Sequence, residues 1–233
     1  MLEARALTGW YGRAQILFDI DLAVGTGEVV SLLGRNGAGK STTFRALAGL
    51  LDRRGGDVRF DGADVSREPA HLRARRGLAY VPEDRRIFGD LTVDENLAVG
   101  RQAARDGAPR WTPARVFALF PSLGAMRTRR GGAMSGGEQQ MLTVARALMG
   151  NPRLVLLDEP SEGLAPKVVE DMAHAILAMK REGLSILLSE QNLHFARLIA
   201  DRAVVLDRGH VRFSGTMAAL AADPALCDAY LSV

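Results

Sequence analysis

A glycine-rich loop that ends in a lysine and a hydroxyl residue is the segment of this chain best suited to chemistry. Residues 34–41 read GRNGAGKS. Its glycines let backbone N–H groups converge on phosphate oxygens, since no Cβ stands in the way. In such a loop the lysine reaches the β- and γ-phosphates of a nucleotide, and the final hydroxyl binds Mg²⁺. The residues that we expect at the phosphates are Gly34, Asn36, Gly37, Ala38, Gly39, Lys40, Ser41 and Thr42.

The segments on either side of this loop have the patterns of a strand and a helix. Residues 28–33 (EVVSLL) form a short, β-branched and apolar run, and residues 41–50 place Phe44, Leu47 and Ala48 on one helical face. A strand, the loop and then a helix is the context in which this motif binds phosphate, because the helix adds the positive end of its dipole. The spacing therefore predicts a triphosphate site rather than an ordinary glycine-rich turn.

A second segment supplies two carboxylates at the end of an apolar run. Residues 154–160 read LVLLDEP. A strand that is apolar up to Leu157 carries Asp158 to its carboxyl end, which is the edge where parallel sheets bind ligands. We expect Asp158 to support Mg²⁺, directly or through water, and Glu159 to polarise the attacking water as a general base. Carboxylates that merely end a strand are the alternative for this segment taken alone.

Between these two segments, residues 134–140 (MSGGEQQ) begin a strongly helical run, and two interpretations compete. Ser135 followed three residues later by Glu138 is a capping box, which starts helices without any ligand. Gly136 and Gly137 each cost about 1 kcal/mol against alanine inside a helix, but they allow a phosphate to approach the positive helix end. The loop at 34–41 already binds the phosphates of this chain, so we expect the ligand of this second helix end to belong to another subunit.

Length and composition favour a soluble globule, either one large domain or one domain with an inserted lobe. The chain has 233 residues, 47% of them hydrophobic and 24% charged, which is enough for one substantial core. No apolar run approaches the ~18 residues that a membrane span needs, and no secretory signal is visible. The single cysteine, Cys227, fits a reducing cytosol.

Net charge argues against a nucleic-acid partner. The net charge is only +3, and the arginines are spread widely, with no aromatic residues interleaved for base stacking. We expect these arginines to form a solvated surface or to contact a protein or a lipid headgroup.

The order of the elements predicts the fold class. Strands dominate the first part of the chain, helices without strands follow between about 91 and 150, and strands and helices then alternate. This order predicts an α/β fold with a mostly parallel sheet flanked by helices, an N-terminal antiparallel β layer and an inserted helical subdomain. We expect a single domain, 1–233, with its core in 1–90 and 151–233 and the helical subdomain in 91–150. The expected strands are 5–8, 17–24, 29–33, 58–61, 154–158, 185–189 and 203–207, and the expected helices are 93–104, 113–120, 137–149, 168–181 and 193–200.

The chain resembles the ATP-binding cassette (ABC) family over essentially its full length. The resemblance rests on GRNGAGKS at 34–41, SGGEQ at 135–139 and LVLLDEP at 154–160, in the family's order and with similar separations. It implies a P-loop NTPase that hydrolyses ATP with Mg²⁺. It also implies a head-to-tail dimer with a second ABC ATPase, identical or not, in which each ATP lies between one subunit's loop and the other's Ser135, Gly136 and Gly137. Two membrane permeases would hold this dimer at the cytoplasmic face of the membrane.

Two further segments match the family's pattern around the nucleotide. Tyr11, in WYGRAQILFDIDL, resembles the aromatic residue that stacks on adenine; Trp10 is the other candidate, and a core tyrosine is the alternative. Residues 161–165 (SEGLA) resemble the loop that crosses the dimer interface.

At two positions the chain departs from the family. Glu83 stands where the family usually has a glutamine that contacts Mg²⁺ and the attacking water; its carboxylate suits Mg²⁺ but adds negative charge, moderated by Arg85 and Arg86. Gln191 stands where most members have a histidine that senses the γ-phosphate. A glutamine donates a hydrogen bond but carries no charge, so we expect it to position phosphate or water without acid–base function. His194, one helical turn later, is expected at the surface or in packing rather than in this role.

Features outside the core motifs resemble the ATPases of branched-chain (hydrophobic) amino acid uptake systems. They are VPEDRRIFGDLTVDENLAVG at 81–100, DEPSEGLAP at 158–166, SEQN at 189–192 and DPALCDAYLSV at 223–233. This resemblance implies an importer with an external solute-binding protein. An importer of urea or short-chain amides and a soluble, non-transport ABC ATPase are the alternatives. A small-molecule kinase with the same phosphate loop has no use for the MSGGE helix.

Overall fold

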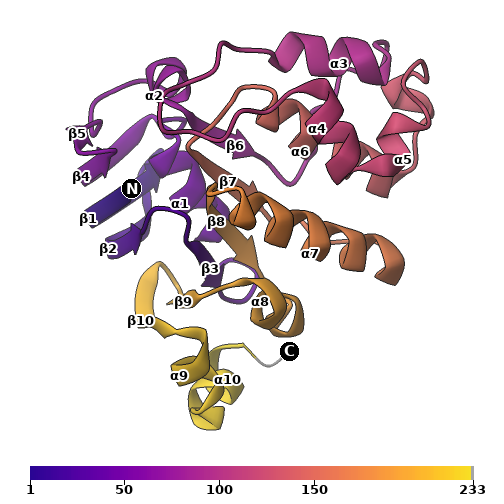
Figure 1. Ribbon diagram of the computed structural model, residues 1–233. Coiled ribbons are helices and arrows are strands. Elements are labelled where there is room, and N and C mark those ends of the chain that lie inside the picture. Colours follow the sequence, from indigo (N-terminus) through magenta and orange to yellow (C-terminus); the bar gives the residue numbers. More distant parts are fainter. Residues whose placement is uncertain (232–233) are drawn as a thin grey trace.

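The computed structural model describes residues 1–231. An antiparallel sheet forms the N-terminal layer of the protein (Figure 1). Buried and more exposed residues alternate along much of its first two strands, as in a sheet with one solvent-facing side. The antiparallel layer expected from the sequence is therefore confirmed. Its strands lie in the order β2 (Ala14–Val24), β1 (Leu2–Tyr11), β4 (Arg53–Phe60) and β5 (Ala63–Asp64).

A second sheet of six strands forms the centre of the molecule. Its order is β10 (His210–Thr216), β9 (Arg202–Asp207), β3 (Val29–Leu33), β8 (Ser185–Glu190), β7 (Leu154–Asp158) and β6 (Leu78–Val81). Every pair is parallel except β9 with β10, which confirms the mostly parallel sheet. All residues of β3, β7 and β8 are buried, because both faces of the sheet are covered. The carboxyl ends of these three strands meet at one edge.

Helices and the antiparallel layer cover the two faces of this sheet. α1 (Lys40–Leu47) shares a hydrophobic core with the antiparallel layer and with alternate residues of β3 and β7. α6 (Gly136–Leu148), α7 (Pro166–Arg181) and α8 (Leu193–Ile199) share the core on the other face. The remaining helices are α2 (Ala70–Arg76), α3 (Val93–Gly100), α4 (Pro113–Leu119), α5 (Pro121–Gly124), a 3-10 helix (Gly131–Ala133), α9 (Met217–Ala221) and α10 (Pro224–Tyr230). No helix within residues 1–231 has both the length and the apolar character that crossing a bilayer requires.

Residues 91–150 hold α3 to α6 and contribute no strand to either sheet. These helices do not have a core of their own. Leu97 and Leu142 belong to the same hydrophobic cluster as Val155 and Leu188 of the central sheet. We therefore propose that residues 1–233 form a single domain, with 91–150 as its helical subdomain; residues 232 and 233, the end of this range and of the 223–233 motif, lie outside the described part.

The helix expected at 93–104 is wrong at its C-terminal end, because α3 stops at Gly100. Tertiary hydrogen bonds take the backbone groups that a longer helix would use. The N–H of Gln102 donates to the carbonyl of Met149 at 3.0 Å, and the amide of Asn151 donates to the carbonyl of Gln102 at 2.9 Å. Gly100 also lies so close to α6 that a Cβ there would be 2.3 Å from the carbonyl oxygen of Arg146.

Several elements were not expected from the sequence. β4 begins at Arg53 rather than at residue 58, because antiparallel pairing with β1 draws the glycine-containing stretch into the sheet, with Gly55 opposite Thr8. β6, β10 and α2 were also missed. β6 is an apolar run of only four residues, at the lower limit of strand length, and β10 is an edge strand of exposed and half-buried residues without a continuous apolar run.

Candidate active site

The glycine-rich loop joins β3 to α1 at the carboxyl edge of the central sheet. Gly37 and Gly39 have φ values of +78° and +108°, a left-handed backbone that favours glycine. Gly39 is the N-cap residue of α1 and provides no capping side chain, so the first N–H groups of the helix are left for another acceptor. The tip of the loop, with Asn36, is exposed, whereas Ala38 and Thr42 are buried. This arrangement fits a phosphate group.

Lys40 and Glu159 meet in the interior, although they lie 119 positions apart in the sequence. Lys40 Nζ lies 3.0 Å from Glu159 Oε1, and the two side chains are 3% and 6% exposed. The ammonium also donates to the carbonyl of Gly34 at 2.7 Å and to that of Arg35 at 3.3 Å. A buried ion pair needs such additional hydrogen bonds to offset its desolvation. The structure thus brings together the phosphate lysine and the expected base.

Asp158 is held by three hydroxyl groups from three elements. Ser189 Oγ and Ser41 Oγ donate to Oδ1 at 2.7 and 3.2 Å, and the Tyr80 hydroxyl donates to Oδ2 at 3.0 Å. Burial raises the pKa of Asp158 above its usual value, although these hydrogen bonds oppose the rise. Mg²⁺ prefers oxygen ligands and commonly takes one or two protein carboxylates beside substrate phosphates and water. Ser41 and Asp158, adjacent at the end of the loop, fit such an ion.

Gln191 lies directly against Glu159. Its Nε2 donates to Glu159 Oε2 at 2.8 Å, and the backbone N–H of Glu159 donates to Ser189 Oγ at 3.0 Å. Burial alone would raise the pKa of Glu159, but the hydrogen bond from Gln191 and the charge of Lys40 outweigh it and hold this pKa below its usual value. The carboxylate is therefore ionised at neutral pH, as a general base must be. Glu159 also has φ of +47°, a strained backbone of the kind often found at functional sites.

Tyr11 is 44% exposed, so the alternative of a core tyrosine is wrong. With Trp10 and Tyr80 it lines a pocket of about 530 Å³. Arg45 Nη1 donates to the Tyr11 hydroxyl at 3.3 Å. The guanidinium of Arg53 lies 4.8 Å from the centre of the Trp10 ring and covers one of its faces. Of the two aromatic candidates for adenine, Tyr11 is the more accessible.

Glu83 is exposed on the loop after β6, in a hollow that it shares with Arg85 and Arg86. No hydrogen bond within residues 1–231 joins it to Ser41 or Asp158. Its negative charge does reach the site: the pKa of Glu162 is raised first by the carboxylate of Glu159 and by burial, and the charge of Glu83 adds to this rise. Its contact with Mg²⁺ stays a prediction.

The tip of α6 lies apart from the phosphate loop of the same chain. Ser135 is the N-cap residue of a complete capping box: its Oγ accepts from the N–H of Glu138, and Glu138 Oε2 accepts from the N–H of Ser135 at 2.7 Å. A Cβ on Gly136 would lie 2.6 Å from Arg85 Nη1, and one on Gly137 2.8 Å from a methyl group of Val168. The stiff, β-branched side chain of Val168 cannot easily move aside, so packing requires Gly137, and this glycine by itself does not indicate a phosphate. The flexible end of Arg85 can move, so packing does not account for Gly136.

Four polar residues around this site were not expected from the sequence. Tyr80 and Ser189 hold Asp158, and Glu162 and Glu190 add carboxyl groups beside Glu159. The register of the central sheet brings Tyr80, Ser189 and Glu190 here, and Glu162 lies on the loop that follows β7. His194, by contrast, is exposed on α8, as expected of a surface residue.

Comparisons with known proteins agree with this geometry. A model of the ABC transporter family matches residues 17–162. The chain is 43% identical over 231 residues to BraG, the high-affinity branched-chain amino acid transport ATP-binding protein of Pseudomonas aeruginosa, with 99% of both chains covered. It is 35% identical over 232 residues to LptB, the lipopolysaccharide export system ATP-binding protein of Escherichia coli, with 99% of this chain and 96% of LptB covered.

A solved structure gives the same result. The ATP binding subunit of an ABC transporter superimposes with a TM-score of 0.80 at 30% identity, over 97% of this chain and 94% of that chain. The family match covers more than half of the sequence, and the relatives cover nearly all of it. The chain therefore belongs to the ABC transporter family, as one of its ATPases.

Proposed function

We propose that this chain is the ATP-hydrolysing subunit of an importer for branched-chain amino acids. The similarity to BraG, at 43% identity over 99% of both chains, is the observation that carries the substrate. The similarity to LptB, a lipopolysaccharide export protein, is lower at 35%. Export of a lipid is therefore the outcome that the test must distinguish from import of an amino acid.

The partners follow from the family. ABC ATPases work as dimers on membrane permeases, and we propose that this chain pairs with a second ABC ATPase, either a copy of itself or a related chain. Two permease subunits would hold the pair at the cytoplasmic face of the membrane, and an external solute-binding protein would deliver the substrate. Nucleic acid has no place in this assembly.

The phosphate loop and Asp158 are proposed to bind ATP with Mg²⁺. The N–H groups of the loop and of the first turn of α1 would bind phosphate oxygens, and Lys40 would reach the β- and γ-phosphates. Ser41 and Asp158 would hold Mg²⁺, which when bound neutralises charge on these phosphates. Tyr11 would stack on adenine from the edge of its pocket.

Glu159 is proposed to accept a proton from the attacking water. In the structure its carboxylate occupies one side of the Lys40 ammonium, so a phosphate that binds Lys40 would take its place and leave Glu159 free to face the water. Gln191, at 2.8 Å, holds the other carboxylate oxygen. Since a glutamine does not titrate, it orients Glu159 without exchanging a proton itself.

The tip of α6 is proposed to act on the nucleotide of the partner. The atoms nearest to a Cβ built on Gly136 or on Gly137 belong to Arg85 and Val168, not to the phosphate loop of the same chain. A head-to-tail dimer would place them over the partner's γ-phosphate, with the 161–165 loop crossing between the subunits.

Reconstitution tests this function. The chain, co-purified with the permeases that it binds and placed in proteoliposomes, should take up labelled leucine only when ATP is supplied on the side of the ATPase. The permeases should also stimulate its ATP hydrolysis. Uptake of urea without leucine would transfer the chain to the amide importers, release of lipopolysaccharide would make it an exporter, and hydrolysis that no permease changes would make it a non-transport ATPase.

A further inference from the structure

A buried carboxylate with no cation beside it lies at the carboxyl edge of the central sheet. Glu190, the last residue of β8, is 2% exposed and pairs with Leu33 at the end of β3. Within residues 1–231 no lysine, arginine or histidine forms an ion pair with it. The negative charge of Glu159 adds to the burial that raises the pKa of Glu190. A buried carboxylate in such surroundings costs folding free energy, which calls for a reason for its presence.

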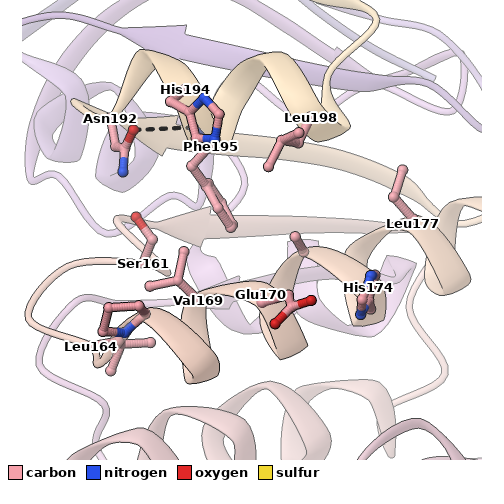
Figure 2. A pocket seen from close by; sticks show the side chains of 12 residues that line it. Ser161, Leu164, Val169, Glu170, His174, Leu177, Asn192, His194, Phe195 and Leu198 are labelled. Atoms are coloured by element: carbon pink, nitrogen blue, oxygen red, sulfur yellow. Dashed lines mark hydrogen bonds between the residues drawn. The ribbon is translucent and has the colours of Figure 1, made fainter.

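Its two oxygens hold two different loops. Oε1 accepts from the N–H of Ser161 at 3.2 Å, and Oε2 accepts from the N–H of Asn192 at 3.4 Å. Ser161 begins the 161–165 loop after β7, and Asn192 is the N-cap residue of α8. Figure 2 shows the side chains of Ser161 and Asn192 at the same end of the pocket between α7 and α8. Glu190 thus ties the end of β7 to the start of α8.

These two loops carry the pair of residues that meet at the hydrolysis site. Glu159 lies two residues before Ser161, and Gln191 lies between Glu190 and Asn192. Glu190 therefore binds the residue after Gln191 and a residue two positions after Glu159, the two side chains that the 2.8 Å hydrogen bond joins. We propose that Glu190 is a positioning residue for ATP hydrolysis, whose carboxylate holds Ser161 to Asn192 and so keeps Gln191 against Glu159. This inference rests on the proposed function of the site.

The chemistry of the two contacts explains why a carboxylate is needed. Each contact uses an oxygen to accept one backbone N–H, and a glutamine has only one such oxygen. Burial raises the pKa of Glu190 to about 7, against the hydrogen bonds that lower it. An amide of the same shape would avoid that desolvation, so folding alone does not favour the acid.

The first experiment replaces Glu190 by glutamine in the full chain. We expect Glu190→Gln to lower kcat at saturating ATP by about tenfold, because a small misplacement of an aligned group is costly. The Kd for ADP should change by less than about twofold, since no residue of the phosphate loop is altered. Amide hydrogen exchange at Ser161 and Asn192 should become faster. The matched control is Glu170→Gln, which makes the same change on the exposed face of α7 and should leave all three measurements unchanged.

A double-mutant cycle separates positioning from a general loss of structure. If Glu190 acts through Gln191, the effect of Glu190→Gln on kcat should shrink to about twofold or less in a Gln191→Ala background. An equal effect in both backgrounds would overturn the inference, and so would a folded Glu190→Gln with full kcat.

A shorter acid provides a second variant if the glutamine chain does not fold. Glu190→Asp keeps both oxygens on a shorter stem, so its kcat should lie between those of wild type and Glu190→Gln. If Glu190→Gln does not fold, the kcat of Glu190→Asp should still lie below that of wild type. A Glu190→Asp chain with wild-type kcat and slow amide exchange would overturn the inference. Absence of hydrolysis in the wild-type chain assembled with its permeases would instead refute the proposed function.

Discussion

The two parts of the proposed ATP site differ in how this chain holds them. At the phosphate loop, Lys40, Asp158 and Glu159 are buried and hydrogen-bonded by residues from several elements. At the tip of α6, Ser135 is exposed and is satisfied within its own helix by Glu138. One part is a network across the sheet, and the other is a local cap.

This difference indicates which functions need a second subunit. The groups that we propose for hydrolysis already have partners at hydrogen-bond distance, so their geometry is set by the fold of one chain. The α6 tip presents a capped helix end with Ser135 exposed to solvent, so its proposed role depends on a partner that docks on it. Substitutions in the first region should therefore change chemistry directly, whereas those in the second should act only in the assembled dimer.

The largest effect is expected from Glu159→Gln. The amide keeps the shape and the hydrogen-bonding capacity toward Lys40 but cannot accept a proton, so hydrolysis should fall by about 10³-fold, or about 4 kcal/mol in the barrier. ATP binding should persist, which would trap a closed dimer. Steady-state hydrolysis and size-exclusion chromatography with Mg²⁺-ATP measure the two outcomes.

A matched carboxylate-to-amide change checks this interpretation. Glu170→Gln lies on the exposed face of α7 and should keep the wild-type rate. Wild-type turnover by Glu159→Gln would remove this residue as the base, and loss of ATP binding would show that it serves structure instead.

The same contrast decides what could be predicted from the sequence. The phosphate loop and the Asp158–Glu159 pair were recognisable because their spacing is local and each follows an apolar strand. Tyr80 and Ser189 were not recognisable, because they reach Asp158 only through the strand order β8-β7-β6, which the sequence alone does not provide. The end of α3 was missed for a similar reason, since Asn151 and Met149, remote in the chain, take its backbone groups.

The next effect concerns the stability of the buried network and its dependence on pH. The pKa of Glu190 is raised from 4.5 to about 7 in the folded chain. A carboxyl group whose pKa is raised by folding binds its proton more tightly in the folded chain. Its favourable contribution to the free energy of unfolding is therefore complete below the unfolded pKa and is lost as the pH rises through the folded pKa. Between pH 4.5 and pH 8, wild type should lose about 3 kcal/mol of unfolding free energy relative to Glu190→Gln.

Urea unfolding of both chains at several pH values measures this difference. The comparison with Glu190→Gln removes the contributions of all other titrating groups, because the two chains share them. A stability difference that does not change between pH 4.5 and pH 8 would show that Glu190 has an ordinary pKa.

The smallest effect separates the two interpretations of the α6 tip, and the chain offers a matched control for it. Thr92 and Ser135 are both N-cap residues of complete capping boxes, on α3 and α6. Each change to alanine should cost about 1 kcal/mol of stability through the lost cap. Only Ser135→Ala should also lower hydrolysis by the assembled dimer, by about tenfold if its hydroxyl binds the partner's phosphate.

Nucleotide binding by the isolated chain should be unchanged in both variants, because neither touches the phosphate loop of its own subunit. Unfolding measured by urea and hydrolysis measured in the reconstituted complex give the two readouts for each variant. Equal rates in Thr92→Ala and Ser135→Ala would reduce Ser135 to a cap, and the contact between the α6 tip and the partner's ATP would then depend on backbone N–H groups alone.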